Sequence, residues 1–533
     1  MDYLTFMEQT TEKINQMSAA EKTDFLLNLL RLTPAVKREQ VLQLMYDDSF
    51  PFEQQFQEYQ NYLTELADKE FHFTAEDEEI YNEFDWEPDY QTILKDTENV
   101  GKKLTEILNF AKQLVYQRHY QAAHDLYTRC LELQFLAYDE ELWEQYEYSL
   151  SDLFNEGLIN DNSHNIIVHL LYTVYQTTDS FTECVKIFYH YLAFPMEDEV
   201  KIADVFTVGP QPLEQTEKFL FDWINFLKIK PSPLADRLLL DAVRTSPYFK
   251  QAEHLFTLAQ ETARFHPQLY LECINSFSEQ NAPEKSLTVG KDGLKKISLN
   301  NKVRSQVAEK VVGFSEQLND NAIIHTAVQD TFYSDPCLDH LFPVLKLPLS
   351  EQEQERLLRF VQNDRSVADR IPLLFFLGQF ENVFKKIGSD HHALGWSVND
   401  KGIIIPLFLL LLRSMQPSLA ARSLMSEIKP RISSQYFDVF ENEFDIWKQT
   451  IFLSEADKVR YINWCKKEVE NRGKDLIVTK FRHHYGRMAY LIVTLGEAEE
   501  NVGITNARAR TIQKYRKAHN RKRNFIAALD ELT

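Results

Sequence analysis

Glycine and cysteine are both scarce in this chain, and each shortage argues against a class of protein. There are 14 glycines among 533 residues, where average usage would be about 7%. No Asn-Gly or Asp-Gly turn lies between alternating apolar runs, which disfavours a β-rich fold. The five isolated cysteines are expected to be reduced, buried small residues of a cytosolic protein, and they are Cys130, Cys184, Cys273, Cys337 and Cys465.

Long apolar runs are missing as well. The most apolar segment, Ile403 to Leu412, has ten residues, whereas a membrane span needs about 20. We expect a buried helix there, with Pro406 in its first turn. The N-terminal residues from Met1 onward lack a basic region followed by an apolar stretch, so we expect no signal peptide. The sequence therefore predicts a cytoplasmic protein with no membrane association.

Sequence motifs of catalysis and cofactor binding are also missing. The glycine-rich phosphate-binding motifs Gly-x-x-x-x-Gly-Lys and Gly-x-Gly-x-x-Gly do not occur. There is also no Gly-x-Ser-x-Gly and no His-Glu-x-x-His. The adjacent pairs His391-His392 and His483-His484 would diverge by about 100° on a helix, so neither pair can hold one ion. We therefore expect no catalytic residue, no cofactor and no metal ligand. A catalytic pair of carboxylates that only folding brings together stays an open alternative.

What the chain does contain is a recurring helical register. Its first two copies have aromatic, small and apolar residues at steps of three, four, three and one, namely Tyr120, Ala123, Tyr127, Cys130 and Leu131, then Phe181, Cys184, Phe188, Tyr191 and Leu192. Two further copies span 235–247 and 286–294. These steps trace one face of a helix, and the small side chains let a neighbouring helix come close. The register predicts stacked helical hairpins.

Helix starts can be placed by their capping residues. Ser18 with Glu21 and Ser350 with Glu353 have the spacing of capping boxes, and Ser454 with Asp457 resembles a third start. A further helix is expected from Thr33 and Pro34 to about Met45. We predict three regions, which are an N-terminal helical unit (1–47), a partly ordered acidic linker (48–99) and a helical array with C-terminal basic capping helices (100–533).

The register resembles the second half of the tetratricopeptide repeat, which is a two-helix unit. The Trp-Leu-Gly signature of the first helix is missing, and the copies are about 61, 51 and 51 residues apart, against about 34 in that repeat. The resemblance implies an all-α fold, built as an irregular α-solenoid of stacked two-helix units.

Residues from about 100 to 533 are also similar to the helical-repeat portion of bacterial proteins that carry a SWIM-type zinc finger. The matching segments are 285–294, 304–311, 394–397 before Pro406, and 484–525. The finger itself is absent, because no Cys-x-Cys followed by Cys-x-His occurs. The resemblance therefore implies a helical scaffold, without the metal or nucleic-acid role of the finger.

Acidic residues are concentrated between positions 76 and 89. They are Glu76, Asp77, Glu78, Glu79, Glu83, Asp85, Glu87 and Asp89, with Trp86 and three other aromatic residues among or beside them. Like charges this dense oppose compaction, so we expect a loop or a mobile segment. Three interpretations of this segment stay open. It is a solvated loop, or it docks on the chain's own C-terminus, or it is a docking strip for a basic partner that uses Glu76, Asp77, Glu78, Glu79 and Trp86.

Basic residues are concentrated near the C-terminus. From Val502 to Asn524 there is no acid, and the eight bases are Arg508, Arg510, Lys514, Arg516, Lys517, Arg521, Lys522 and Arg523. Three interpretations of these bases stay open. They form the solvated face of a capping helix, or they bind an acidic partner or segment 76–89, or they contact nucleic-acid phosphates. The net charge of −22 disfavours a nucleic-acid surface spread over the whole body.

Taken together, these features predict a non-catalytic helical-repeat scaffold that binds a protein partner. One alternative is a nucleic-acid-associated protein that uses a basic C-terminal helix over residues 502–524. A second alternative is an enzyme whose site the sequence does not display.

Overall fold

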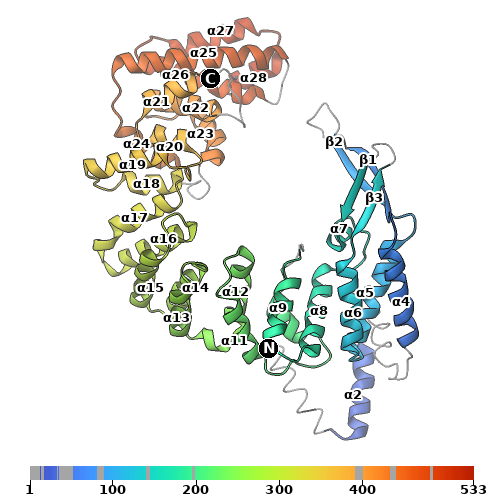
Figure 1. Cartoon of the computed structure of the whole chain (residues 1–533). Coiled ribbons are helices and arrows are strands. Elements are labelled where there is room, and N and C mark those ends of the chain that lie inside the picture. Colours follow the sequence, from blue (N-terminus) through green and yellow to red (C-terminus); the bar gives the residue numbers. More distant parts are fainter. Residues whose placement is uncertain are drawn as a thin grey trace. The chain divides into compact units, whose positions relative to one another are not determined.

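The computed structural model describes residues 13, 17–32, 34, 52–80, 89–139, 144–194, 199–389, 400–432, 440–479 and 484–532. Within these residues the chain is mostly helical, with 26 α-helices, one short 3₁₀ helix and four β-strands (Figure 1). The predicted predominance of helix is confirmed, and the small sheet is a correction to it. The chain divides into two compact units, Met1–Leu269 and Tyr270–Thr533, and this division falls inside the predicted array 100–533.

The first unit contains the sheet and the first half of the helices (Figure 1). Its elements are α2 (Ala19–Leu32), α4 (Phe52–Ala67), β1 (Phe73–Ile80), β2 (Asp89–Lys95), α5 (Val100–Tyr116), α6 (Tyr120–Glu132), β3 (Phe135–Asp139), β4 (Glu144–Tyr148), α7 (Leu150–Asn155), α8 (Ser163–Thr177), α9 (Phe181–Tyr191), α10 (Ile202–Thr207), α11 (Thr216–Leu227), α12 (Pro233–Thr245), η2 (Pro247–Lys250) and α13 (Ala252–Thr262). Helix α14 (Gln268–Glu279) spans the division between the units.

The second unit is helical throughout its described residues. Its elements are α15 (Pro283–Lys296), α16 (Lys302–Leu318), α17 (Asn321–Ser334), α18 (Leu338–Leu345), α19 (Glu351–Asn363), α20 (Arg370–Phe376), α21 (Phe380–Gly388), α22 (Lys401–Leu412), α23 (Leu419–Ile432), α24 (Phe440–Gln449), α25 (Glu455–Thr479), α26 (Tyr485–Asn501), α27 (Ala507–Ala518) and α28 (Arg523–Asp530).

The sheet of the first unit has the strand order β2-β1-β3-β4. Strands β1 and β2 pair antiparallel, β1 and β3 pair parallel, and β3 and β4 pair antiparallel. His72 joins the sheet to α4, because its Nε2 donates to the carbonyl of Leu66 (2.8 Å) and its Nδ1 accepts from the amide of Leu136 (3.0 Å). The apolar side chains of Phe73 and Phe135 are buried beside it.

The expected loop over 76–89 is wrong for the residues that belong to β1 and β2. Glu76, Asp77, Glu78 and Glu79 lie in β1, opposite Ile93, Thr92, Gln91 and Tyr90 of β2. These four acidic positions are therefore paired backbone positions of an antiparallel ladder, and not a loop. Trp86 and the helix expected over Thr33–Met45 lie outside the described residues, apart from Pro34.

The capping predictions are confirmed. The Ser18 amide donates to Glu21 (2.8 Å) at the start of α2. A complete capping box joins Ser350 and Glu353 at the start of α19. The amide of Asp457 donates to the hydroxyl of Ser454 (3.1 Å) at the start of α25. In each case the side chain satisfies an amide that the first turn of a helix leaves unpaired.

The predicted helical register corresponds to buried faces. In α6 and α9 the small residues Ala123, Cys130 and Cys184 have no exposed surface. In α15 the two glycines permit close packing, since a Cβ atom added to Gly290 would lie 2.5 Å from Val311 Cγ2 of α16. A Cβ atom on Gly293 would lie 2.9 Å from Tyr270 of α14. Small residues at these steps therefore mark helix–helix contacts, as expected.

Helix α22 contains the most apolar segment of the chain, and all of its residues are buried. The helix begins at Lys401, two residues earlier than expected, and the carbonyl of Asp400 accepts from the amides of Ile403 and Ile404. Pro406 is therefore in the second turn and not the first. None of the helices in the described parts of the chain combines the length and the apolar content that crossing a bilayer requires.

Candidate functional site

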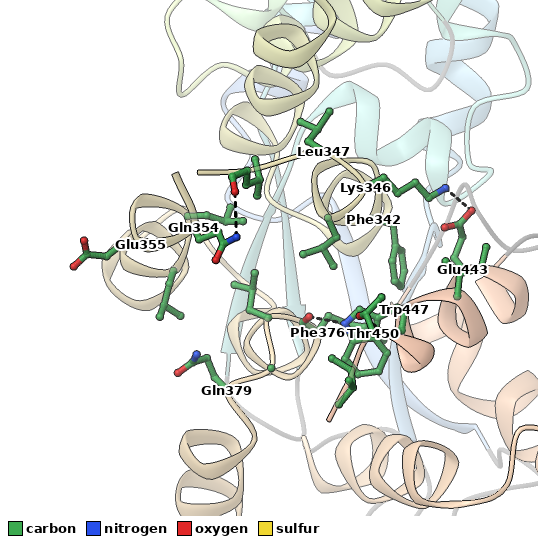
Figure 2. A pocket seen from close by; sticks show the side chains of 18 of the residues that line it. Phe342, Lys346, Leu347, Gln354, Glu355, Phe376, Gln379, Glu443, Trp447 and Thr450 are labelled. Atoms are coloured by element: carbon green, nitrogen blue, oxygen red, sulfur yellow. Dashed lines mark hydrogen bonds and ion pairs between the residues drawn. The ribbon is translucent and has the colours of Figure 1, made fainter. Parts of the chain in front are cut away.

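An apolar hollow of about 520 Å³ lies in the second unit (Figure 2). Its walls come from the C-terminal half of α18, the connection to α19, α19 itself, the end of α20 and α24 with the residues that follow it. Most of the lining side chains are apolar, among them Leu347, Leu349, Leu358, Ile446 and Ile451. A concave apolar surface with few polar groups is the usual form of a binding site.

Aromatic side chains form the floor of the hollow. The rings of Phe342 and Phe376 are 5.0 Å apart, and those of Phe376 and Trp447 are 4.7 Å apart. The indole Nε1 of Trp447 donates to the carbonyl of Phe376 (2.8 Å), as Figure 2 shows. The floor is therefore fixed by ring packing and by one buried hydrogen bond, so α20 and α24 hold the hollow open in one shape.

Polar groups lie around the apolar lining and are mainly acidic. Lys346 Nζ is 2.7 Å from Glu443 Oε1, and this pair lies on one side of the hollow (Figure 2). Glu351 and Glu355 are exposed on α19, where the carboxylate of Glu355 points outward. The amide of Gln354 donates to the carbonyl of Leu349 (3.2 Å) and fixes the connection into α19. Glu443 is paired with Lys346 and Glu355 with Arg359 (2.5 Å), so Glu351 is the rim carboxylate that no ion pair of the described residues neutralises.

Apolar side chains continue from the hollow onto the surface beside it. Ile446 lines the hollow and is 45% exposed, and Phe452, directly after the lining residue Ile451, is 92% exposed. Exposed apolar side chains that adjoin a concave apolar surface are typical of a protein contact site. The hollow and these two side chains together define what we call the apolar hollow surface.

A second cluster lies where α17 ends and α18 begins. Cys337 is the N-cap residue of α18, and its Sγ is 3.3 Å from Nδ1 of His340 in the first turn. The same Nδ1 is 2.6 Å from the backbone carbonyl of Asp335, so it carries a proton that it donates. On the other side of the ring, Nε2 is 3.0 Å from Oε1 of Glu309 in α16.

The contacts of His340 indicate its charge. Burial lowers its pKa, but the hydrogen bonds with Cys337 and Glu309 outweigh burial and raise the pKa to about 10. The ring is therefore an imidazolium near neutral pH, with an acceptor at each nitrogen. Cys337, Asp335 and His340 also place one ligand atom each within 4.8 Å of the others, which is close enough to hold a metal ion.

The predicted basic residues form no single helix. Helix α26 ends before Gly503, which has a left-handed backbone (φ 94°), α27 ends at Ala518, and α28 begins at Arg523. The single basic helix expected over 502–524 is therefore wrong. Helix α27 stops because the backbone of His519 (φ −124°, ψ 31°) leaves the helical conformation.

Four of the eight predicted bases are held by other groups of the second unit. Arg508 pairs with Glu497 (3.3 Å), Lys514 pairs with Glu470 (2.5 Å), and Arg516 pairs with Asp530. Arg510 donates to the carbonyl of Thr505 (2.5 Å). The other four have side chains with no hydrogen bond or ion pair within the described part of the chain, and they are Lys517, Arg521, Lys522 and Arg523.

The acidic positions Glu76 to Glu79 belong to the first unit and the eight bases belong to the second. Docking of the acidic segment onto the basic one stays a prediction.

Sequence reasoning missed both the apolar hollow and the cluster around His340. The hollow has no motif, because its walls come from residues 342–451. The cluster had a local signal in Cys337-x-x-His340 at a helix start, but Glu309 is 31 residues away. The expectation that every cysteine is buried is wrong for Cys337, which is half-buried because it caps α18 at the surface.

Comparisons with known proteins give no match, whether made against protein-family models, curated proteins or solved structures.

Proposed function

We propose that this chain is a non-catalytic scaffold, built as an irregular α-solenoid, that binds a protein partner through the apolar hollow surface. The observation that carries the proposal is the coexistence of a preformed apolar hollow, an acidic rim and two exposed apolar side chains beside it. A solvent-exposed apolar surface of this kind is typical of a protein–protein contact.

Packing of helices in sequence order supports the solenoid. Within the first unit α5 packs on α6, α6 on α8, α8 on α9, and α9 on α11. Within the second unit α15 packs on α16, α16 on α17, and α17 on α18. Each of these helices buries its apolar face against the next, which is how repeat proteins without one central core are stabilised.

The chemistry of the hollow favours, as its occupant, a short segment of a partner protein with apolar side chains next to a lysine or an arginine. The aromatic floor accepts an aliphatic or aromatic side chain, and burying one such side chain contributes about 1.5–3 kcal/mol. The exposed carboxylate of Glu351, which has no ion pair among the described residues, favours a base at the rim and disfavours an acid.

The test is a selection of peptides from a random displayed library on the full chain. Enriched peptides should carry at least two large apolar residues and one base. Their affinity should fall at least tenfold in Ile446→Asp, because a charge is placed in the apolar contact. Ile504→Asp is the matched control, since Ile504 is 42% exposed and Ile446 45%, and Ile504 does not line the hollow.

Peptides that bind Ile446→Asp and Ile504→Asp equally well would contradict the proposal, as would an absence of enrichment. Enriched peptides rich in acids would contradict the stated chemistry of the rim. Circular dichroism of both variants confirms that each keeps its helical structure.

A second candidate function is contact with nucleic-acid phosphates. It is favoured by the four bases without a partner and by a surface hollow lined by Arg510, Gln513, Lys514, Arg516 and Lys517. Tight binding of mixed-sequence RNA at about 0.15 M salt, lost in the triple variant Arg521→Glu, Lys522→Glu, Arg523→Glu, would favour this function. The scaffold proposal predicts no such binding.

A further inference from the structure

All five cysteines lie in the described part of the chain, and Cys337 differs from the other four. Cys130, Cys184, Cys273 and Cys465 are buried with no exposed surface. Burial raises the pKa of Cys130 and of Cys184 to about 12 and also raises that of Cys465, so these three stay protonated. Cys337 is half-buried, so small molecules in solvent can reach it.

The surroundings of Cys337 place two positive features beside its sulfur. The Nδ1–H of His340 is 3.3 Å from Sγ and points toward it and the carbonyl of Asp335. Cys337 is also the N-cap residue of α18, where the helix dipole is positive. A hydrogen-bonded imidazolium and a helix N-terminus are the features that favour a thiolate over a thiol.

Glu309 gives His340 its orientation. Its Oε1 accepts from Nε2 at 3.0 Å, so the ring cannot turn without losing that hydrogen bond. The thiol of Cys337, the imidazole of His340 and the carboxylate of Glu309 are thus linked by two successive contacts, as they are where a histidine activates a cysteine. The other charged groups of the cluster are Asp335, which pairs with Lys302 (3.3 Å), and the buried Asp339 of α18.

We propose that Cys337 is a reactive thiol that hydrogen peroxide oxidises to a sulfenic acid, with His340 as its positioning residue. The thiolate sulfur attacks one peroxide oxygen, and the S–O bond forms as the O–O bond breaks. The sulfur loses two electrons to the peroxide, and the leaving hydroxide takes a proton from solvent to become water. The inference is independent of the proposed partner binding, since it uses no residue of the apolar hollow surface.

The first test measures alkylation of all five cysteines in the native full chain. The chain is treated with iodoacetamide from pH 6 to pH 8, digested and quantified by mass spectrometry. Cys337 should react at least about tenfold faster than each buried cysteine at pH 7.

Two histidine variants distinguish activation of Cys337 by His340 from mere exposure of Cys337 to solvent. His340→Gln should slow alkylation of Cys337 about tenfold at pH 6, because it removes the imidazole beside the sulfur. His325→Gln, on α17, removes a histidine whose carboxylate partner is Glu353, and it should leave Cys337 unchanged. Glu309→Gln keeps the side-chain shape and should give an intermediate rate, even if His340→Gln loosens the local fold.

The second test adds hydrogen peroxide and traps sulfenic acid with dimedone. Cys337 should be the labelled cysteine in the wild type, and labelling should fall in His340→Gln. Equal alkylation of Cys337 in the wild type and His340→Gln at pH 6 would overturn the proposal, and so would an absence of dimedone adduct. Protection of Cys337 by Zn²⁺, with a sulfur-to-metal absorption band on adding Co²⁺, would overturn it in favour of a metal site at Asp335, Cys337 and His340.

Discussion

Helices α15 and α22 of the second unit are held in place in opposite ways. Helix α15 comes close to its neighbours through Gly290 and Gly293, while Glu284, Thr288 and Lys295 on its other side are exposed. Helix α22 is apolar on every side and is enclosed by α20, α23, α25 and α26. The first arrangement leaves one face in water, as in a stacked hairpin, and the second builds a local core.

Buried charged side chains lie at both ends of α22. The buried ammonium of Lys448 donates to the carbonyls of Leu410 and Arg413 (2.8 Å each) at the C-terminus of α22. Lys401, at its N-terminus, is buried against Glu468 (3.3 Å). A fully enclosed helix needs such partners because water cannot reach its unpaired backbone groups. The described part of the second unit therefore contains both a helix with one face in water, α15, and a helix that is enclosed on every side, α22.

The largest effect is expected from emptying the core around α22. Phe408 has no exposed surface and packs on Phe375 and Tyr461. Phe408→Ala should lower the free energy of unfolding of the second unit by about 3–5 kcal/mol. Phe452→Ala is the control at a 92% exposed position and should change it by less than about 0.5 kcal/mol. Urea titration followed by hydrogen exchange of peptides from the second unit measures both.

A smaller loss of folding stability is expected from adding a methyl group where α15 closely contacts α16. Gly290→Ala would place Cβ 2.5 Å from Val311 Cγ2, and it should cost about 1–3 kcal/mol. Gly313→Ala in α16 is the matched control, since nothing lies within 4 Å of its added Cβ. It should stabilise the helix by up to about 1 kcal/mol. Equal effects of the two substitutions in the same urea experiment would mean that α15 does not depend on close approach.

The smallest effect is a pH dependence carried by Lys448. Burial, together with the nearby charge of Arg413, lowers its pKa to about 7, while the unfolded chain has a lysine pKa of about 10.4. The unfolded state then binds more protons above pH 7, so this group's contribution to stability rises with pH by up to about 1.4 kcal/mol per unit. Buried cysteines oppose this trend, so the measured quantity is the difference between the wild type and Lys448→Met from pH 7 to pH 9. A difference that does not change with pH would contradict the shift.

The sequence predicts those features of the fold that depend on residues within one or two helical turns. The capping box of Ser350 and Glu353 spans three residues, and the register of α6 and α15 repeats within one helix. The sheet was missed because β1 pairs with β3, which lies about 60 residues away. The dense acidic residues of β1 predicted a loop, because the sequence alone does not show which residues of β2 pair with them.

Functional surfaces could be predicted less well, for the same physical reason. A run of bases is visible in sequence, but Lys514 is neutralised by Glu470, 44 residues away. The apolar hollow draws Phe342, Leu358 and Trp447 from three helices. Neither the pairing of the bases nor the shape of the hollow is encoded in a local pattern.

The central claim, that a basic apolar peptide occupies the apolar hollow surface, is tested most directly by hydrogen exchange of the full chain with and without a selected peptide. We expect slower exchange in residues 345–358, 376–379 and 443–451, and no such change in Ile446→Asp. Slower exchange confined to other segments, or an equal change in Ile446→Asp, would contradict the claim.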